Sequence, residues 1–131
     1  PDGLIWGTNT GGSDIYVIDP ATQEKIASFE VGPTPQQIAF AYKGMAGPNA
    51  YVTLGGSNKV VVVKADPKDL RILEEIDVGQ RPNGIWANPD GTRVFVVHEV
   101  SNDLRVIDTG TSQVIATVPV GQKPIRVVVS R

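Results

Sequence analysis

The segment Glu30-Val31-Gly32-Pro33-Thr34-Pro35 occurs in three related versions along the chain. The two later versions read Asp77-Val78-Gly79-Gln80-Arg81-Pro82 and Pro119-Val120-Gly121-Gln122-Lys123-Pro124. Segments rich in Val and Ile, which begin at Ile15, Val60 and Leu104, recur with a similar spacing. Both series give a repeat length of roughly 40–50 residues, which indicates a protein built from repeated supersecondary units.

Each repeat contains four short apolar segments separated by turn residues, and this pattern predicts four β-strands. Asn88-Pro89-Asp90-Gly91 is the clearest turn, since proline presets φ and glycine accepts a positive φ. We expect Asp19, Asp66 and Asp108, which precede other turns, to accept bonds from nearby backbone N–H groups. By position in the repeat, the expected strands are 38–40, 85–87 and 125–129; then 4–6, 51–53 and 94–97; then 15–19, 60–64 and 104–108; and finally 26–31, 72–78 and 114–120.

A repeat of four short strands is typical of a β-propeller blade. The sequence therefore predicts an all-β fold with three four-stranded antiparallel blades, from repeats at approximately 1–40, 41–87 and 88–131. We expect the C-terminal strand to complete the first blade, because joining the two ends recreates a strand, turn and strand. The segment 60–63 is apolar at every position, as in a strand buried on both faces. Pro119 indicates an exposed edge strand, since proline cannot donate to a strand ladder.

Three blades do not close a ring, because known propellers have about four to eight. An isolated wedge would expose two apolar blade faces, which soluble monomers rarely do. The partners that we expect are therefore other propeller blades. They belong either to the missing part of a longer protein or to a second copy of this chain, which would give a homodimer of about six blades.

The run Ala50-Tyr51-Val52-Thr53-Leu54, with Val106-Ile107-Asp108 and the segment 114–121, resembles the YVTN-type β-propeller repeat family. The resemblance covers essentially the whole chain, although Leu54 replaces the asparagine that gives the family its name. It implies a propeller fold but no single function. The resemblance also implies a location outside the cytoplasm or on the cell surface. Related repeats occur in lactonases, quinone-dependent dehydrogenases and enzymes of nitrogen-oxide reduction. Full members usually have six or seven blades, which favours the interpretation that this chain is part of a longer protein.

The composition excludes several classes of function. The 131-residue chain has a net charge of −2 and a pI near 5.3, so it offers no electrostatic footprint for nucleic acid. It has no cysteine, which removes disulfides, thiolate metal sites and cysteine nucleophiles. No apolar run approaches the roughly 18 residues that cross a bilayer, and no signal peptide is visible. Serine-nucleophile, phosphate-loop and dinucleotide motifs do not occur.

The loops after the second and fourth strands of each blade emerge at one face, and propellers bind ligands where such loops meet on a rigid scaffold. Arg81 and Lys123 have matched positions and could hold an anionic ligand, although the first repeat has Thr34 there. The alternative is that both are solvated loop residues. The ligand-binding candidates on this face are Arg81, Lys123, His98, Glu99, Asn102 and Asn9.

His98 is the single histidine, and its functional interpretation is a metal ligand or a general base beside Glu99. Its structural interpretation is a surface histidine that closes a strand. One histidine does not build a typical transition-metal site, so we predict no metal site, no cofactor and no catalytic residue here. Trp6 and Trp86 could stack on a planar ligand, but both lie in strand patterns that favour packing between blades.

These observations favour a non-catalytic propeller scaffold that binds a ligand or a protein outside the cytoplasm. One alternative is a part of a propeller oxidoreductase or lactonase-like hydrolase whose catalytic residues lie elsewhere. A further alternative is an excised or engineered propeller-assembly fragment, since the two ends of the chain complement each other. Solution mass and metal content separate these alternatives.

Overall fold

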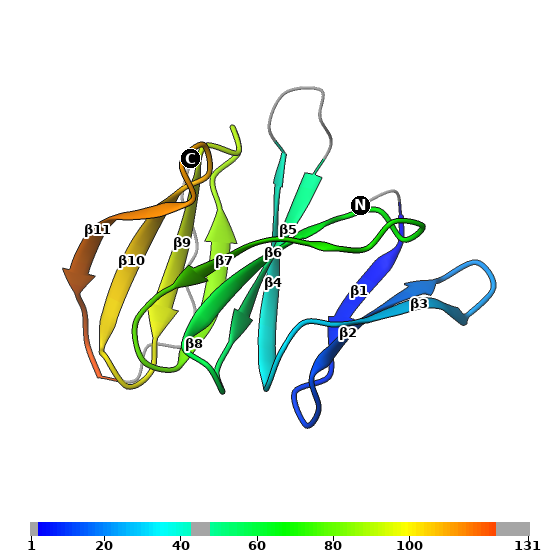
Figure 1. Ribbon diagram of the computed structural model, residues 1–131, viewed down its shortest axis with the longest axis horizontal. Coiled ribbons are helices and arrows are strands. Elements are labelled where there is room, and N and C mark those ends of the chain that lie inside the picture. The colour runs from blue at the N-terminus through cyan, green and yellow to red at the C-terminus, as the bar shows by residue number, and fades with distance from the viewer. Residues whose placement is uncertain (1–2, 43–47, 123–131) are drawn as a thin grey trace.

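The computed structural model describes residues 3–42 and 48–122, and the regular elements in that part of the chain are all β-strands. They form three antiparallel sheets, which lie side by side (Figure 1). Blade 1 contains β1 (Ile5–Thr8), β2 (Asp14–Asp19) and β3 (Glu24–Glu30). Blade 2 contains β4 (Pro35–Tyr42), β5 (Pro48–Leu54), β6 (Lys59–Lys64) and β7 (Ile72–Asp77). Blade 3 contains β8 (Pro82–Ala87), β9 (Arg93–His98), β10 (Asp103–Asp108) and β11 (Gln113–Pro119).

The predicted all-β class with antiparallel blades is confirmed. Strands that are consecutive in sequence are neighbours within each sheet. The loop after β3 leads from the outermost strand of blade 1 to β4, the innermost strand of blade 2, and the loop after β7 leads in the same way to β8. These two loops are the recurring Val-Gly segments of the sequence. The strand predicted at 125–129, which would complete blade 1, lies outside the described residues.

Blade 2 is buried on both faces, and β6 shows this most clearly. Val60 to Val63 are each at most 2% exposed. Because successive strand residues point to opposite faces, Val60 and Val62 join the core between blades 2 and 3, while Val61 and Val63 join the core between blades 1 and 2. Burying one such side chain stabilises the fold by about 1.5–3 kcal/mol. The prediction of a doubly buried strand is confirmed.

The outermost strands are exposed edges. Five of the six residues of β7 are exposed, and most residues of β3 and β11 are exposed as well. Pro119 ends β11 at such an edge, where its missing N–H removes no ladder bond, as the sequence predicts. In the described part of the chain, no helix is long and apolar enough to cross a membrane.

The turns use the side chains that the sequence predicts. Asp19, Asp66 and Asp108 each accept a bond from the backbone N–H two residues later, with nitrogen-to-Oδ1 distances of 2.9, 3.0 and 2.7 Å. In the turn after β8, Gly91 has φ +73° and its N–H donates to the carbonyl of Asn88. This bond closes a tight β-turn, which places β9 antiparallel to β8.

The recurring glycine is a point of close approach between a loop and the blade that follows it. A Cβ on Gly32, which has φ +134°, would lie 2.7 Å from Cδ1 of Leu54. A Cβ on Gly79 would lie 3.0 Å from Cδ2 of His98. Leu54 and His98 both end the second strand of their blade, so the same contact occurs twice. The repeat therefore requires glycine because the loop rests directly on the next blade.

Candidate functional site

Two clusters of polar side chains lie on either side of the loop that joins blades 2 and 3. The first, the Arg81 cluster, contains Arg81, Glu99, Asn83 and Gln37. The second, the His98 cluster, contains His98, Asp103, Arg105 and Ser101. Both contain residues that the sequence singles out, but their surroundings differ.

Arg81 is held by its backbone and by its side chain. It has φ +57°, and Thr34, the matched residue of the previous loop, has φ +55°. The backbone N–H of Arg81 donates to Oδ1 of Asn58 at 3.0 Å, and its carbonyl accepts from the N–H of Glu99 at 2.9 Å. Its Nε lies 2.8 Å from Oε2 of Glu99, while 55% of the Arg81 side chain stays exposed. The guanidinium is therefore ordered and still accessible to solvent.

A chain of amide side chains continues this cluster onto the innermost strands. Asn83 donates through Nδ2 to Oε1 of Glu99 at 3.2 Å, and Gln37 donates through Nε2 to Oδ1 of Asn83 at 3.3 Å. The hydroxyl of Thr53 donates to the carbonyl of Asn83 at 2.8 Å. The register shifts in both β4 and β8 just after their first proline, and such bulges redirect side chains. Polar groups thus join blades 2 and 3 beside their shared apolar core.

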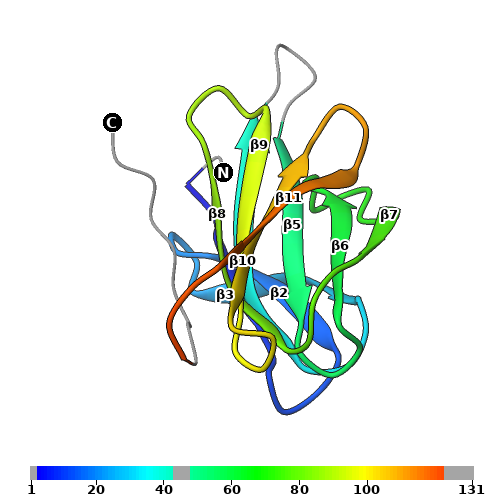
Figure 2. The same ribbon diagram turned by 90° about the vertical axis from the view of Figure 1, so that its left-hand side faces the viewer.

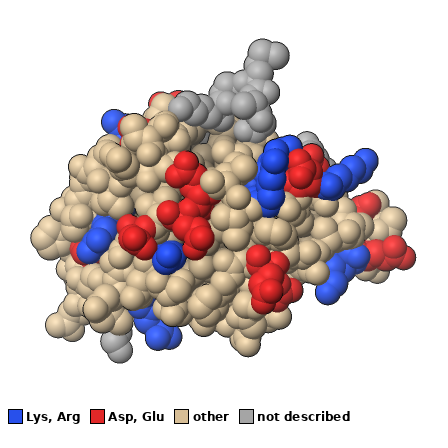
Figure 3. Space-filling view, viewed as in Figure 1, with Lys and Arg blue, Asp and Glu red and all other residues tan. Residues whose placement is uncertain are grey.

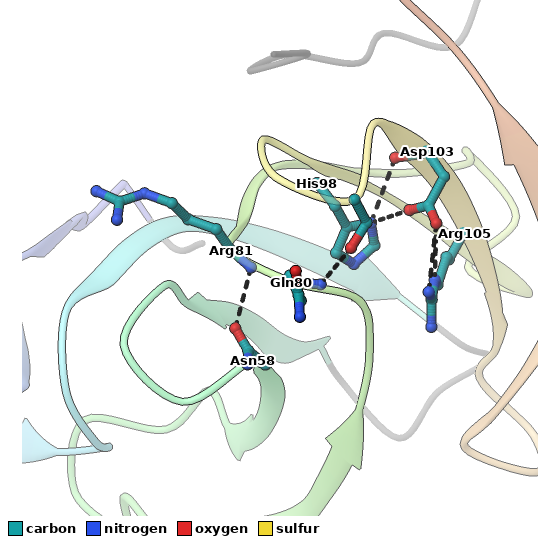
Figure 4. A network of polar contacts seen from close by, with 7 residues as sticks. Asn58, Gln80, Arg81, His98, Asp103 and Arg105 are labelled. Carbon is teal, nitrogen blue, oxygen red and sulfur yellow. Dashed lines mark hydrogen bonds and ion pairs between the residues drawn. The ribbon is translucent and has the colours of Figure 1, made fainter. Parts of the chain in front are cut away.

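His98 is fully buried, in contrast to the surface position considered for it from sequence. Its Nδ1 lies 2.9 Å from Oδ1 of Asp103 and 3.3 Å from the carbonyl oxygen of the same residue. Asp103 is 8% exposed, and its Oδ2 lies 3.2 Å from Nη2 of Arg105. Figure 4 shows this chain of contacts, with the Arg81 side chain extending away from it.

The surroundings of His98 favour the neutral imidazole. Burial lowers the pKa of His98, and this effect outweighs the nearby Asp103, which acts in the opposite direction. A neutral ring with its proton on Nδ1 donates to Asp103 and leaves Nε2 as an acceptor. Nε2 is buried and has no hydrogen-bond partner among the described residues. A ligand cannot reach this ring without moving the loop that carries Gly79, so His98 in this conformation is a structural residue.

The other sequence candidates are distributed over the molecule. Asn102 has φ +54° and its N–H donates to the carbonyl of His98, so it forms the turn between β9 and β10. Asn9 donates through Nδ2 to Oδ1 of Asp14 at 3.0 Å within blade 1. Lys123 lies outside the described residues. Among the described residues, no group of three or more His, Cys, Asp or Glu side chains is placed to hold a metal ion.

The two tryptophans have different environments. Trp6 packs against the core between blades 1 and 2, where its ring meets Phe40 edge-on with centroids 5.5 Å apart. It also lines a pocket of about 260 Å³ between these blades. The residues around this pocket are Trp6, Gly7, Thr8, Gln37, Ile38 and Phe40. Trp86 is 43% exposed on the outward side of blade 3.

Sequence reasoning missed Gln37 and Asn83. Both follow the loop proline by one or two positions, where the first and second repeats have Pro35-Gln36-Gln37 and Pro82-Asn83-Gly84. Polar side chains near the start of an otherwise apolar innermost strand are the signal that could have found them. Figure 3 shows acidic and basic side chains interspersed over one face of the molecule, with no large patch of one sign.

Comparisons with known proteins identify the fold. No protein-family model matches the sequence, and no curated protein matches it. Hydrazine synthase of Kuenenia stuttgartiensis is 28% identical over 95% of this chain, with a TM-score of 0.81, and the match covers 35% of that chain. A protein of unknown function from Desulfotomaculum acetoxidans is 22% identical over 90% of this chain, with a TM-score of 0.77 and 38% of that chain covered.

The β-propeller domain of Cps50 (Swd1) from Myceliophteria thermophila is 16% identical over 95% of this chain, with a TM-score of 0.70 and 40% of that chain covered. The sheets described above are therefore three blades of a β-propeller. The chain spans well under half the length of the solved structures that it matches.

Proposed function

We propose that this chain is a three-bladed part of a β-propeller and serves as a binding scaffold, with the Arg81 cluster as its contact surface. The observation that carries the proposal is the exposed Arg81 guanidinium, which an ion pair with Glu99 holds in place, while the Arg81 backbone N–H donates to Oδ1 of Asn58. An arginine whose position is fixed loses less side-chain entropy when it binds a partner. A location outside the cytoplasm belongs to the same proposal and rests on the resemblance of the repeats.

The chemistry of the cluster favours a partner that carries a carboxylate. The planar guanidinium matches a carboxylate, and Nε is the nitrogen that contacts Glu99. Asn83 and Gln37 place amide groups next to it, and these groups donate or accept bonds from a peptide. The surface thus suits the C-terminal end of a peptide or another polar carboxylate better than an apolar ligand.

The test is a titration of isotope-labelled protein with a short peptide that ends in a carboxylate, followed by NMR of the backbone amides. We expect shifts at Arg81, Asn83 and Glu99, and much weaker shifts with the same peptide in its amidated form. The matched variant is Arg81→Thr, which places the residue of the previous repeat at this position. Equal shifts with both peptides, or shifts that persist in the variant, would contradict the proposal.

A second candidate function is a structural part of a propeller enzyme whose catalytic residues lie in other blades. Its support is the 28% identity with hydrazine synthase over 95% of this chain. Binding of the carboxylate peptide separates the two functions, because the scaffold requires it and a structural part of an enzyme does not. Peptide binding that Arg81→Thr abolishes would favour the scaffold, while no binding by folded wild-type protein would favour the structural part of an enzyme.

A further inference from the structure

The loop 78–82, which joins β7 to β8, is in contact with both polar clusters. On the side of blade 2, the side chain of Asn58 accepts a hydrogen bond from the backbone N–H of Arg81 at 3.0 Å. On the side of blade 3, the backbone N–H of Gln80 donates to Oγ of Ser101. The loop that carries Arg81 is therefore held between the β5–β6 turn and the β9–β10 turn.

The turn between β9 and β10 bonds directly to the backbone of this loop. The N–H of Glu99 donates to the carbonyl of Arg81 at 2.9 Å. His98 and Asp103 are paired across the two strands at the base of the same turn. Figure 2 shows the turn and the loop at the same end of the molecule. A change in the contact between His98 and Asp103 therefore acts on the element that holds Arg81.

The loop also lies directly on the imidazole of His98. A Cβ on Gly79 would lie 3.0 Å from Cδ2, the ring carbon that is bonded to Nε2. Nε2 is buried and has no hydrogen-bond partner among the described residues. In the neutral ring with its proton on Nδ1, Nε2 is an acceptor without charge. A protonated ring would place an N–H donor and a positive charge in the same buried position, which costs much more free energy.

The charged neighbours of His98 do not offset this cost. Asp103 attracts a protonated ring, but it is already paired with Arg105, whose charge repels that ring. Burial has the larger effect and lowers the pKa of His98. The neighbouring strand β8 has no titratable side chain. The charged side chains of the turn, the loop and the adjoining ends of β6 and β7 form ion pairs of their own, Glu99 with Arg81 and Lys59 with Asp77.

We infer that protonation of His98 displaces the loop 78–82, so that acid moves Arg81 and weakens binding at the Arg81 cluster. Solvation of a protonated ring requires the loop to leave Nε2, because Gly79 lies against that side of the ring. This movement breaks the bond from the Glu99 N–H to the Arg81 carbonyl, and the guanidinium loses its fixed position beside Glu99. His98 is thus a positioning residue for Arg81. The inference rests on the proposed function for the binding event, while the displacement of Arg81 is testable without a partner.

The junction between blades 1 and 2 has the same backbone contact without the histidine. There the N–H of Gly55 donates to the carbonyl of Thr34 at 2.9 Å. Leu54 takes the place of the histidine and lies against the loop glycine, Gly32. This first loop is a control within the same molecule, because it rests on a side chain that does not titrate.

The first experiment follows the free protein by NMR from about pH 8 to about pH 5, a range in which histidine titrates. We expect the ring signals of His98, the Nε–H signal of Arg81 and the amide of Glu99 to change with one common midpoint, below the pKa of about 6.5 of an unperturbed histidine. The amide of Gly55 should not follow that midpoint. Arg81 signals that stay constant while His98 titrates would overturn the inference. So would a ring that stays neutral throughout, or a Gly55 signal that changes with the ring, which would indicate global unfolding.

Two variants test whether His98 causes the change. Asp103→Asn removes the charge that attracts a protonated ring, so the midpoint should fall equally for the ring and for Arg81. His98→Leu, which copies Leu54 of the first junction, should leave the Arg81 signals constant. If His98→Leu does not fold, Asp103→Asn still decides, because a midpoint that moves for the ring alone would overturn the inference.

The second experiment measures binding of the carboxylate peptide at about pH 7 and about pH 5, where a terminal carboxyl with a pKa of about 3.5 stays ionised. We expect wild-type binding to be several-fold weaker at the lower pH. The limit is about 30-fold, the ratio of protonated to neutral forms of a solvated histidine at that pH. His98→Leu should bind equally at both pH values.

The outcomes of the second experiment separate this inference from the proposed function. Equal wild-type binding at the two pH values would overturn the inference and leave the proposed function intact. No binding at about pH 7 would overturn the proposed function, and the NMR titration would then decide whether His98 moves Arg81.

Discussion

The His98 cluster and the Arg81 cluster lie close together and have opposite properties. His98 is fully buried and Asp103 is 8% exposed, while the Arg81 side chain is 55% exposed. Both clusters pair a cation or a histidine with a carboxylate. In the buried cluster, loss of the contact between His98 and Asp103 leaves polar groups shielded from water, whereas in the exposed cluster water replaces a lost contact. We infer that the first cluster stabilises the fold and that the second is free to bind.

The largest effect is expected for Asp103→Ala. The change leaves Nδ1 of His98 without the carboxylate beside it and Arg105 without its ion pair. We expect the free energy of unfolding to fall by about 3 kcal/mol. The measurement is urea denaturation, with Glu99→Ala as the control from the exposed cluster, expected to cost about 0.5 kcal/mol. Equal losses in the two variants would remove the distinction between the clusters.

The second largest loss of stability is expected for Gly79→Ala, which adds a methyl group against the His98 cluster without changing its polar groups. The new Cβ would lie 2.9 Å from Oγ of Ser101 and 3.0 Å from Cδ2 of His98. Overpacking of this kind costs about 2 kcal/mol. Gly11→Ala is the control, because a Cβ there meets nothing within 4 Å. Thermal unfolding should separate the two variants by several degrees, and coincident melting curves would show that the loop does not rest on blade 3.

A smaller effect is expected from pH. Burial lowers the pKa of His98 in the folded chain, whereas the unfolded histidine has a pKa of about 6.5. Below about pH 6.5 the unfolded chain therefore binds more protons than the folded chain, so the free energy of unfolding falls as pH falls. The contribution of neutral His98 to stability is complete above that pH. His98→Leu, which copies Leu54 of blade 2, should lose this dependence. A wild-type slope between pH 5 and 7 that the variant retains would assign the effect to other groups.

The smallest effect on stability is expected for Arg81→Thr. Thr34 has almost the same positive φ at the matched position, so this loop geometry accommodates threonine. We expect less than about 0.5 kcal/mol of change in the free energy of unfolding, because an exposed ion pair contributes little. Binding of the carboxylate peptide should nevertheless be lost. Calorimetry measures both, and a variant that is unstable as well as inactive would place Arg81 with the buried cluster.

Much of the fold follows from the sequence, because the signals are local. The valines of β6, the edge proline at 119 and the capping carboxylates such as Asp108 depend on neighbours within a few residues. The burial of His98 is different, since it requires the loop at Gly79 to lie on the strand that ends at residue 98. The spacing of residues in the sequence does not predict the contact between Gly79 and His98.

The Arg81 cluster could be predicted only in part. Its position in a loop follows from the repeat, and so does its match to Thr34. The contacts with Asn83 and Gln37 depend on bulges in β4 and β8, which shift the register after each loop proline. The sequence shows polar residues there but not the irregular pairing that brings them together.

The transfer of the chain from the outer strand of one blade to the inner strand of the next has an evolutionary consequence. A gene duplication of one repeat inserts a unit whose outer strand leads to the inner strand of the next blade, as it does at the two described junctions. Every junction of the enlarged protein is then a copy of a junction that already existed. Recombination between repeats can therefore change the number of blades without inventing a new interface.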